Sequence, residues 1–317
     1  MIRIKVLCAL FKPSQPPTRC AGTHEFVYDP ACEDYDWLVV FDEMPVEREV
    51  LRCPRERTIL CTWEPVSIKS YSRTYTRQFG HLLTNRPPEA ERHPHYHLGR
   101  GYFPMFVKSV PASSEAILAG KKAVVSAVCS AKRMRHTKHE ARFELMRRLA
   151  ADIPGFDWYG RGIRPLVAKE EALLPYRYHV AVENHIAPGH WTEKLSDSIL
   201  CECLTFYAGD PDVGKVLPPE SLIPIPIDDP ETATRIIRSA IGRDEYEHRR
   251  PAILEAKRLI VTRYNFWAQV IELVKSEAGA TFAAEPAGRI YSRRALRRHS
   301  AAAAAEDLWI HLKRGFR

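Results

Sequence analysis

The sequence lacks the long apolar stretch that a membrane span requires. No run of 18 apolar residues occurs in the 317 residues, and the apolar start at residues 4–11 is too short and too interrupted for a span or a secretory signal. The eight cysteines contain no Cys-x-x-Cys pair and no regular spacing, so they suggest no disulfide framework. We therefore expect reduced, mostly buried thiols in a cytosolic protein.

Acidic residues are too few to balance the basic ones. The formal net charge is +8 and the pI about 9.1. Residues 289–317 carry eight Lys/Arg against one Glu and one Asp, so this stretch supplies +6 and leaves +2 for the rest. Such a balance favours anionic partners, namely nucleic acid, phosphorylated small molecules or an acidic membrane surface. A nucleic-acid-binding protein usually carries its basic patch on the folded domain, whereas here the excess lies in a tail.

Short apolar runs alternate with polar connectors in both halves of the chain. In the first half, residues 4–11, 37–41, 57–62 and 81–84 predict buried parallel strands, and residues 67–79 predict a helix. Residues 86–115 are rich in proline, histidine and glycine, and we interpret them as a link. The second half predicts strands at 122–129, 156–159, 178–183 and 204–208, and helices at 137–151, 192–201 and 246–276.

This alternation predicts an α/β fold of two facing Rossmann-like domains, each with a parallel sheet. The expected division is residues 1–110 for the first domain, 111–285 for the second, and 286–317 for a basic tail.

The stretch from residue 176 to residue 211 carries the densest chemical pattern. The predicted strand ends at Glu183 and Asn184, a loop with Pro-Gly follows, and a helix is expected to open at Thr192. Thr192 is a good N-cap, and the free N–H groups of a first helical turn attract anions. Lys194 adds a charge suited to phosphate, and Glu193 could accept hydrogen bonds from ribose hydroxyls. Taken alone, Thr-Glu-Lys is also compatible with a capped helix and a solvated Glu-Lys pair.

The compound pattern resembles the family-ten glycosyltransferases, the α1,3/α1,4-fucosyltransferases. That family has Tyr-Lys-Phe, an apolar run, Glu-Asn, a short loop, Tyr-x-Thr-Glu-Lys, and a Pro-x-Tyr-x-Gly-type strand end. The corresponding residues here lie within about 40 positions: Tyr176-Arg-Tyr178, Glu183-Asn184, Thr192-Glu193-Lys194 and Phe206-Tyr-Ala-Gly209. A looser similarity extends over residues 57–275. His190 stands where the family has an aromatic residue, and Cys203-Leu-Thr205 replaces an apolar-Pro step.

The resemblance implies a GT-B fold, a GDP-fucose or similar GDP-sugar donor, and inverting transfer to a glycan hydroxyl. Because Arg142, Lys194 and the helix start at Thr192 could neutralise the departing diphosphate, we expect no metal ion to be required. It implies donor-binding roles for Tyr178, Glu183, Asn184, His190, Thr192, Glu193 and Lys194. Arg142, in a helix before Asp157-Trp-Tyr-Gly160, resembles the family's diphosphate-binding arginine, with Arg135 as the alternative in a crowded basic region.

Glu64 is the candidate general base. It follows the predicted strand 57–62, and ligands bind at the carboxyl ends of strands in open α/β sheets. Glu64-Pro65 resembles the family's Glu-Ser-Pro step with the serine missing. A glutamate before proline is otherwise often a turn residue, and Asp42 and Glu43 after the strand 37–41 are competitors.

Two stretches resemble metal-binding patterns, and each has a simpler interpretation. Asp210-Pro-Asp212 fits an Asp-x-Asp ion-binding step, but it is also ordinary turn chemistry. The histidines of His93-Pro-His-Tyr-His97 have no matching ligand spacing.

The tail, with Leu308, Trp309 and several arginines, suits an amphipathic helix on an anionic membrane surface, or else a disordered segment. The alternatives to an active transferase are a nucleic-acid-binding protein, whose affinity would depend on salt and on the tail, and an inactive glycan-binding relative.

Overall fold

The computed structural model describes residues 1–9, 23–66, 68–101, 110–111, 113–132, 138–280 and 288–315. The chain divides into two compact units. The first unit comprises Met1–Gly99 together with Val270–Arg317, and the second comprises Arg100–Gln269.

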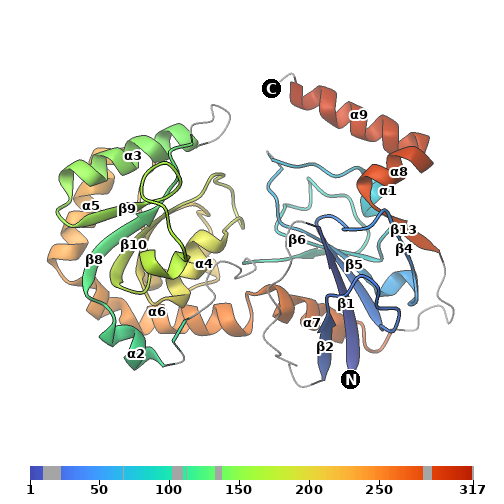
Figure 1. Ribbon diagram of the computed structural model, residues 1–317, viewed down its shortest axis with the longest axis horizontal. Helices are drawn as coiled ribbons and strands as arrows, with labels where there is room; N and C mark the ends of the chain where they lie inside the picture. Colours follow the sequence, from blue (N-terminus) through green and yellow to red (C-terminus); the bar gives the residue numbers. More distant parts are fainter. Residues whose placement is uncertain are drawn as a thin grey trace. The chain divides into compact units, whose positions relative to one another are not determined.

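The first unit is built on a six-stranded parallel sheet with the order β2-β1-β3-β5-β6-β7 (Figure 1). Its strands are β1 (Ile2–Cys8), β2 (His24–Val27), β3 (Trp37–Phe41), β5 (Thr58–Thr62), β6 (His81–Thr84) and β7 (Tyr96–Leu98). The apolar runs therefore form strands as predicted, since buried parallel strands are nearly continuous in Val, Ile and Leu. The helix predicted at 67–79 is wrong in extent, because among the described residues 68–79 the structure has a helix only at α1 (Arg73–Thr76).

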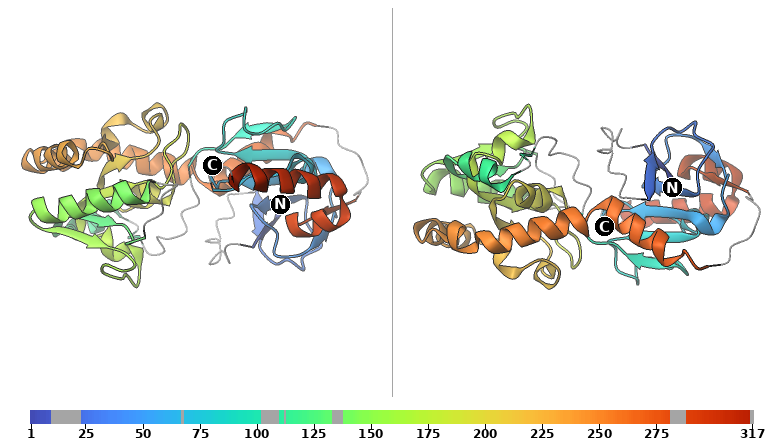
Figure 2. Two further views of the ribbon diagram at one scale, coloured as in Figure 1. Left: turned by 90° about the horizontal axis from the view of Figure 1, so that it is seen from above. Right: turned by 90° about the horizontal axis from the view of Figure 1, so that it is seen from below.

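The C-terminal segment belongs to the first unit. Strand β13 (Arg289–Tyr291) pairs antiparallel with β4 (Arg48–Val50). Helices α8 (Arg293–His299) and α9 (Ala301–Gly315) follow and are drawn in red in Figure 2. Helix α9 packs against α1. Ile290, Leu296 and Ala303 are buried among residues of the first sheet. The predicted separate tail at 286–317 is thus corrected: its small and apolar side chains complete a core that the first unit would otherwise expose.

Several tail arginines form ion pairs with acidic residues of the same unit. Arg298 contacts the Glu47 carboxylate, and Arg293 lies 3.3 Å from that of Glu43. Arg297 lies 3.6 Å from Asp307 on the neighbouring helix. These pairs neutralise part of the charge excess that sequence alone places on a free tail.

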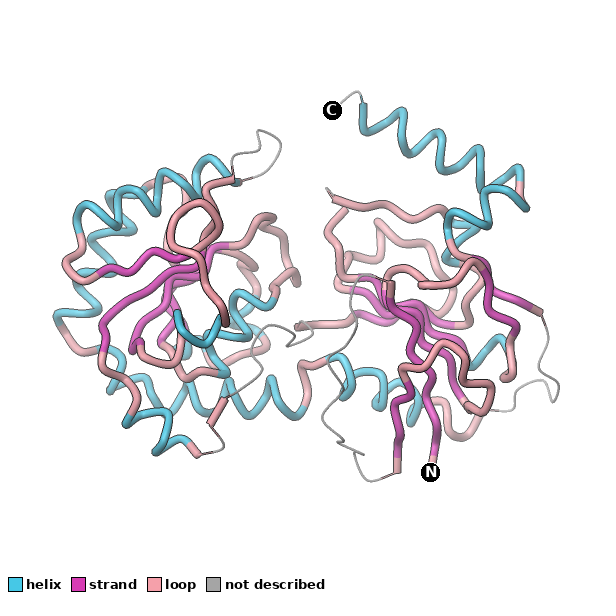
Figure 3. Tube along the Cα trace, in the orientation of Figure 1, coloured by secondary structure: helices cyan, strands magenta, loops and turns pink. Residues whose placement is uncertain are grey.

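The second unit is a three-layer α/β/α sandwich around a five-stranded parallel sheet with the order β12-β11-β10-β8-β9 (Figure 3). The strands are β8 (Ala123–Val128), β9 (Phe156–Tyr159), β10 (Tyr176–Val182), β11 (Leu204–Ala208) and β12 (Leu222–Pro224). Helices α3 (His139–Asp152) and α5 (Pro230–Gly242) pack on one face, and α4 (Glu193–Leu200) packs on the other. Helix α6 (Glu245–Thr262) contributes to both cores, with Tyr246 and Ile253 on the α3–α5 side and Ala256 and Ile260 on the α4 side. The short helix α2 (Ser114–Ala119) precedes β8.

The long helix predicted at 246–276 is two helices, α6 and α7 (Phe266–Ser276). Asn265 separates them, because its side-chain amide donates to the carbonyl of Val261 at 2.8 Å and its Oδ1 accepts from the N–H of Ala268 at 2.9 Å. One side chain thus caps the end of one helix and the start of the next. The boundary between the two units also falls here, since Val270 begins the second stretch of the first unit.

Among the described residues, no helix is long and apolar enough to span a lipid bilayer. The seven cysteines in those residues are all free thiols, and five of them are buried.

Candidate functional site

The carboxyl end of β10 is fixed by a buried carboxylate. Glu183 has no exposed side-chain surface, and it accepts hydrogen bonds from the N–H of Thr192 at 2.9 Å and from its hydroxyl at 2.7 Å. The Tyr207 hydroxyl donates to the same carboxylate at 3.4 Å. The prediction that Glu183 contacts a ligand is therefore corrected. Its oxygens face protein groups from β11 and from the start of α4, so Glu183 positions that helix start.

The loop before α4 is closed by a second carboxylate. Asp210 Oδ1 accepts from the N–H of Gly189 and from that of Asp212, both at 2.8 Å. Gly209 allows this close packing, because a Cβ there would lie 2.1 Å from the Tyr207 hydroxyl oxygen. The Asp-Pro-Asp step thus acts as a turn that holds the loop. In the parts of the chain that the structure describes, no group of three His, Cys, Asp or Glu side chains is arranged to hold a metal ion.

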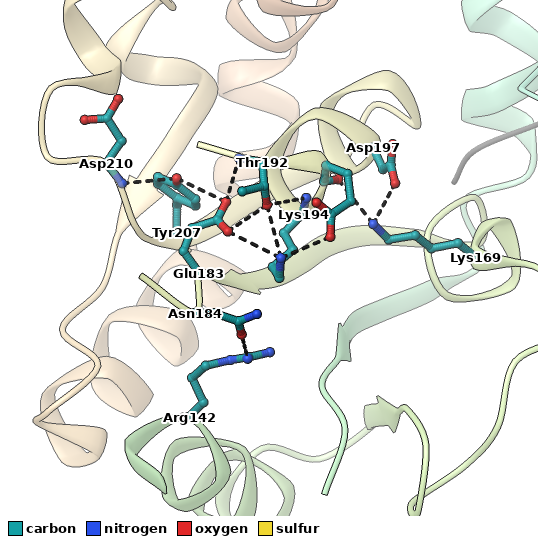
Figure 4. A network of polar contacts seen from close by, with 10 residues as sticks. Arg142, Lys169, Glu183, Asn184, Thr192, Lys194, Asp197, Tyr207 and Asp210 are labelled. Carbon is teal, nitrogen blue, oxygen red and sulfur yellow. Dashed lines mark hydrogen bonds and ion pairs between the residues drawn. The ribbon is translucent and has the colours of Figure 1, made fainter. Parts of the chain in front are cut away.

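Helix α4 begins with the predicted cap. The Thr192 hydroxyl accepts from the N–H of Lys194 at 3.3 Å. The Lys194 ammonium lies 3.0 Å from a Glu193 oxygen and 3.5 Å from a Glu183 oxygen (Figure 4). Burial opposes the charge of Lys194, but the two carboxylates outweigh it and raise its pKa. Lys194 is therefore a cation fixed by ion pairs in the first turn of α4, with about a fifth of its side chain exposed.

Arg142 and Asn184 meet at the same edge of the sheet. The Arg142 guanidinium, from the first turn of α3, donates to the side-chain oxygen of Asn184 just beyond β10 (Figure 4). Arg142 is 5% exposed, and within the described residues its Nε has no hydrogen-bond partner. Its partner is a neutral amide, and among the described residues Arg142 forms no ion pair. A buried cation whose charge is not neutralised is well suited to an anionic ligand.

Lys169 is a site residue that the sequence did not indicate. It lies in the 3₁₀ turn Lys169–Ala172, and its ammonium contacts Asp197 Oδ2 at 2.6 Å and the Glu193 carbonyl at 3.2 Å. Burial raises the pKa of Asp197 to about 6, although Lys169 lowers it in part. Lys169, Glu193 and Lys194 line a cavity of about 210 Å³ over the β10 face that carries His179 and Ala181. Nothing in the local sequence marks Lys169, because its partners are 24 and 28 residues away.

Two further predicted donor contacts lie in different environments. Tyr178 is 2% exposed and packs in the core, where its ring stacks on Phe206 and its hydroxyl accepts from the N–H of Tyr246 at 3.1 Å. The prediction that Tyr178 contacts a ligand is corrected, because its side chain points into the core beneath α3 and α5 and cannot reach a ligand. His190 lies in the loop before α4 with 7% exposure, and its ring is 5.5 Å from that of His185. Arg135 lies outside the described residues.

Glu64 lies in the first unit, two residues beyond β5. Its main-chain carbonyl accepts from Arg86 Nε at 2.8 Å, which fixes the turn after the strand. The competing carboxylates are engaged by a lysine, since Lys69 lies 2.8 Å from Asp42 and 2.9 Å from Glu43. Burial raises the pKa of Asp42, and the hydrogen bond from Lys69 offsets this in part.

Known structures resemble this chain in fold. The chain superposes on a crystal structure of an α1,3-fucosyltransferase with GDP-fucose with a TM-score of 0.50 and 15% identity, covering 89% of this chain and 92% of that one. The chain has a GT-B-type fold. A second α1,3-fucosyltransferase structure, with GDP, gives a TM-score of 0.48 at 15% identity, covering 78% of this chain and 81% of that one. The Anabaena protein HepE, solved with UDP and glucose, gives 0.47 at 10% identity, covering 78% and 79%.

No protein-family model and no curated protein matches the sequence. At 15% identity the structural likeness establishes the fold alone, and it confirms the predicted class of two Rossmann-like α/β units. Within this GT-B-type fold, Arg142, Asn184, Thr192, Glu193 and Lys194 gather at the carboxyl edge of the second sheet. Ligands bind at that edge in open α/β sheets.

Proposed function

We propose that this protein is a glycosyltransferase that moves a sugar from a nucleotide-sugar donor to a hydroxyl of a glycan acceptor. The observation that carries the proposal is the group of cations at the start of α4. Arg142, Lys169 and Lys194 come from three separate elements and lie around the start of α4. Such an arrangement stabilises the negative charge of a departing nucleoside diphosphate.

The carboxylates of the site are more deeply buried than its lysines. Two carboxylates, Glu183 and Asp197, have no exposed side-chain surface and hold Lys194 and Lys169 from behind. The lysines themselves keep 14–19% of their side-chain surface exposed. The cations are thereby oriented before a ligand arrives, so little reorganisation is needed when charge develops on the diphosphate. Arg142 adds a charge that no described carboxylate balances.

Glu193 suits the recognition of a sugar hydroxyl. Its carboxylate is ionised at all physiological pH values, because the charges of Lys194 and Lys169 overcome the effect of burial and lower its pKa to about 2. An ionised carboxylate accepts hydrogen bonds and donates none, which fits the hydroxyls of a ribose.

We further propose that the donor is GDP-fucose or a close relative and that transfer inverts the anomeric centre. Glu64 would take the proton from the acceptor hydroxyl. The oxygen of that hydroxyl would form the new bond to the anomeric carbon, and the bond between this carbon and the diphosphate would break. The support is the resemblance of residues 176–211 to the family-ten fucosyltransferases together with the shared fold. With three cations aimed at one edge, we expect transfer to proceed without a metal ion.

The exposed face of α9 supports a proposed contact with an anionic membrane from the cytoplasmic side. Leu308, Trp309 and Leu312 are each more than half exposed. These positions lie one, three and four residues apart on one helix, so their side chains share a face.

A thermal-shift screen of nucleotides and nucleotide sugars tests the donor assignment. GDP and GDP-fucose should raise the melting temperature of the wild-type protein, and UDP-glucose and CMP-sialic acid should not. The Lys194→Ala and Glu193→Ala variants should fold and show a smaller shift with GDP, and Glu220→Ala, an exposed residue of the same unit, serves as the control. A shift with UDP-glucose alone would replace the fucosyl donor, and no shift with any nucleotide would refute the proposed function.

A further inference from the structure

A second cavity, of about 700 Å³, lies within the first unit. Its walls come from the 3₁₀ turn Arg55–Arg57 before β5, the segment leading into β6 and the loop leading into β7. The cavity therefore lies at the amino ends of these parallel strands, whereas Glu64 follows the carboxyl end of β5. A strand of five residues separates the two ends by roughly 16 Å, so the cavity is distinct from the proposed catalytic edge.

Three arginines surround this cavity. Arg55, Arg77 and Arg92 are all exposed, and in the described part of the chain none of them forms an ion pair with a carboxylate. Glu56 and Glu277 also line the cavity. The guanidinium groups therefore exceed the carboxylates by one, and the rings of neighbouring histidines add further N–H donors.

The arginines are held on a close-packed frame. A Cβ on Gly80 would lie 2.6 Å from the Arg55 carbonyl oxygen and 2.7 Å from the Glu56 Cα, so only glycine lets these segments approach. The N–H of Gly80 donates to the Thr58 hydroxyl at 2.9 Å, and Arg55 Nε donates to the Gln78 carbonyl at 3.0 Å. These contacts bring the turn that carries Arg55 against the segment that carries Arg77.

Histidines fix the loop that carries Arg92. His93 is buried, its Nε2 lies 3.2 Å from the Phe79 carbonyl oxygen, and its Nδ1 accepts from the N–H of His95 at 3.2 Å. Both ring nitrogens are thus engaged by the main chain, and His93 is a structural residue rather than a metal ligand. The His95 ring is exposed and lies 5.4 Å from that of His81. A loop held in this way needs little ordering when a ligand binds.

We propose that this cavity binds a sugar that carries a phosphate group. Guanidinium groups match phosphate oxygens with paired N–H bonds, and three of them lie around this one cavity. The volume lies within the range of small-molecule pockets, roughly 300–1,000 Å³, and far exceeds what a bare phosphate fills. The imidazole rings and the carboxylates of Glu56 and Glu277 supply donors and acceptors for sugar hydroxyls. The site is independent of the proposed nucleotide site in the second unit.

Calorimetric titration of the full-length protein with glucose 6-phosphate tests the proposal, with inorganic phosphate and glucose as separate probes. We expect glucose 6-phosphate to bind at least about tenfold more tightly than either probe, since both the phosphate and the sugar make contacts. Arg77→Ala/Arg92→Ala should weaken this binding at least about tenfold, because each change removes charge-assisted hydrogen bonds. Both side chains are exposed, so the double variant should fold.

Two control variants separate this site from other sources of binding. Arg48→Ala removes an exposed arginine of the same unit that lies outside the cavity, and it should leave the affinity unchanged. Lys194→Ala should weaken GDP binding and leave glucose 6-phosphate binding intact, whereas the Arg77/Arg92 variant should do the reverse. No binding by the wild-type protein, equal affinity for phosphate and glucose 6-phosphate, or loss of binding with Lys194→Ala alone would each overturn the proposal.

Discussion

Replacing Glu193 by glutamine should destabilise the second unit in a way that depends on pH. Burial alone would raise the pKa of Glu193, but the charges of Lys194 and Lys169, with hydrogen bonds from Lys194 and Thr192, lower it from 4.5 to about 2. At about 1.4 kcal/mol per pKa unit, this difference corresponds to about 3 kcal/mol of stability from the ionised carboxylate. Only 18% of the Glu193 side chain is exposed, so solvent screening removes little of this energy.

The direction of the pH dependence follows from the lowered pKa. The folded protein releases this proton more readily than the unfolded chain, so the stabilisation is complete above pH 4.5 and is lost as the pH falls toward 2. At pH 7, Glu193→Gln should lower the free energy of unfolding by about 3 kcal/mol. At pH 3.5 the gap between the two proteins should be smaller by about 1.4 kcal/mol, because the wild type has lost that part of its stabilisation.

Urea unfolding at pH 7 and at pH 3.5, followed by circular dichroism, measures these free energies. Hydrogen exchange of the α4 amides shows whether the loss lies at the helix start or elsewhere in the two units. Glu220→Gln, at an exposed position of the same unit, should stay within about 0.5 kcal/mol of the wild type at both pH values. If Glu193→Gln costs the same at pH 7 and pH 3.5, the carboxylate does not titrate as the ion pairs require and the reasoning is wrong.

Four further predictions concern function. Glu64→Gln should lower turnover by about 10²–10⁴-fold with GDP affinity unchanged, and a variant that keeps more than about a tenth of wild-type turnover would move the base elsewhere. Arg142→Ala should weaken GDP binding more than Lys194→Ala in calorimetry, since no described carboxylate already balances Arg142; the opposite order would contradict this. Transfer should persist in excess chelator, and a loss restored by Mg²⁺ or Mn²⁺ would disprove metal independence. Leu308→Ser/Trp309→Ser should reduce sedimentation with anionic vesicles, and equal binding by the double variant would exclude this face.

The C-terminal segment shows how the structure changes the design of the membrane experiment. Truncation before residue 288 would remove β13 and α8, whose Ile290 and Leu296 are buried in the first unit. A truncated protein could therefore fail to bind vesicles simply because that unit unfolds. Substitutions on the exposed face of α9 avoid this problem.

The sequence by itself determined the fold class, most strands and the start of α4. Strand β3, for example, was predictable because a continuous Trp-Leu-Val-Val-Phe run is the local signature of a buried parallel strand. The Thr192 cap was predictable because capping depends on residues two or three positions apart. Propensity and capping are properties of neighbouring residues, so they can be read without the tertiary structure.

Only the tertiary structure decided which side chains meet. The family resemblance named Arg142 and Asn184 separately, but only the structure shows that they meet across 42 residues, and nothing local marks Lys169 and Asp197, which are 28 residues apart. The same holds for Glu183, which the family resemblance placed at a ligand and which packs behind the start of α4 in the structure. Burial and ion pairing arise when the sheet brings distant segments to one edge, and a linear pattern contains no record of that edge. Sequence therefore predicted most of the strands and the start of α4, and packing determined which side chains meet and what each of them contacts.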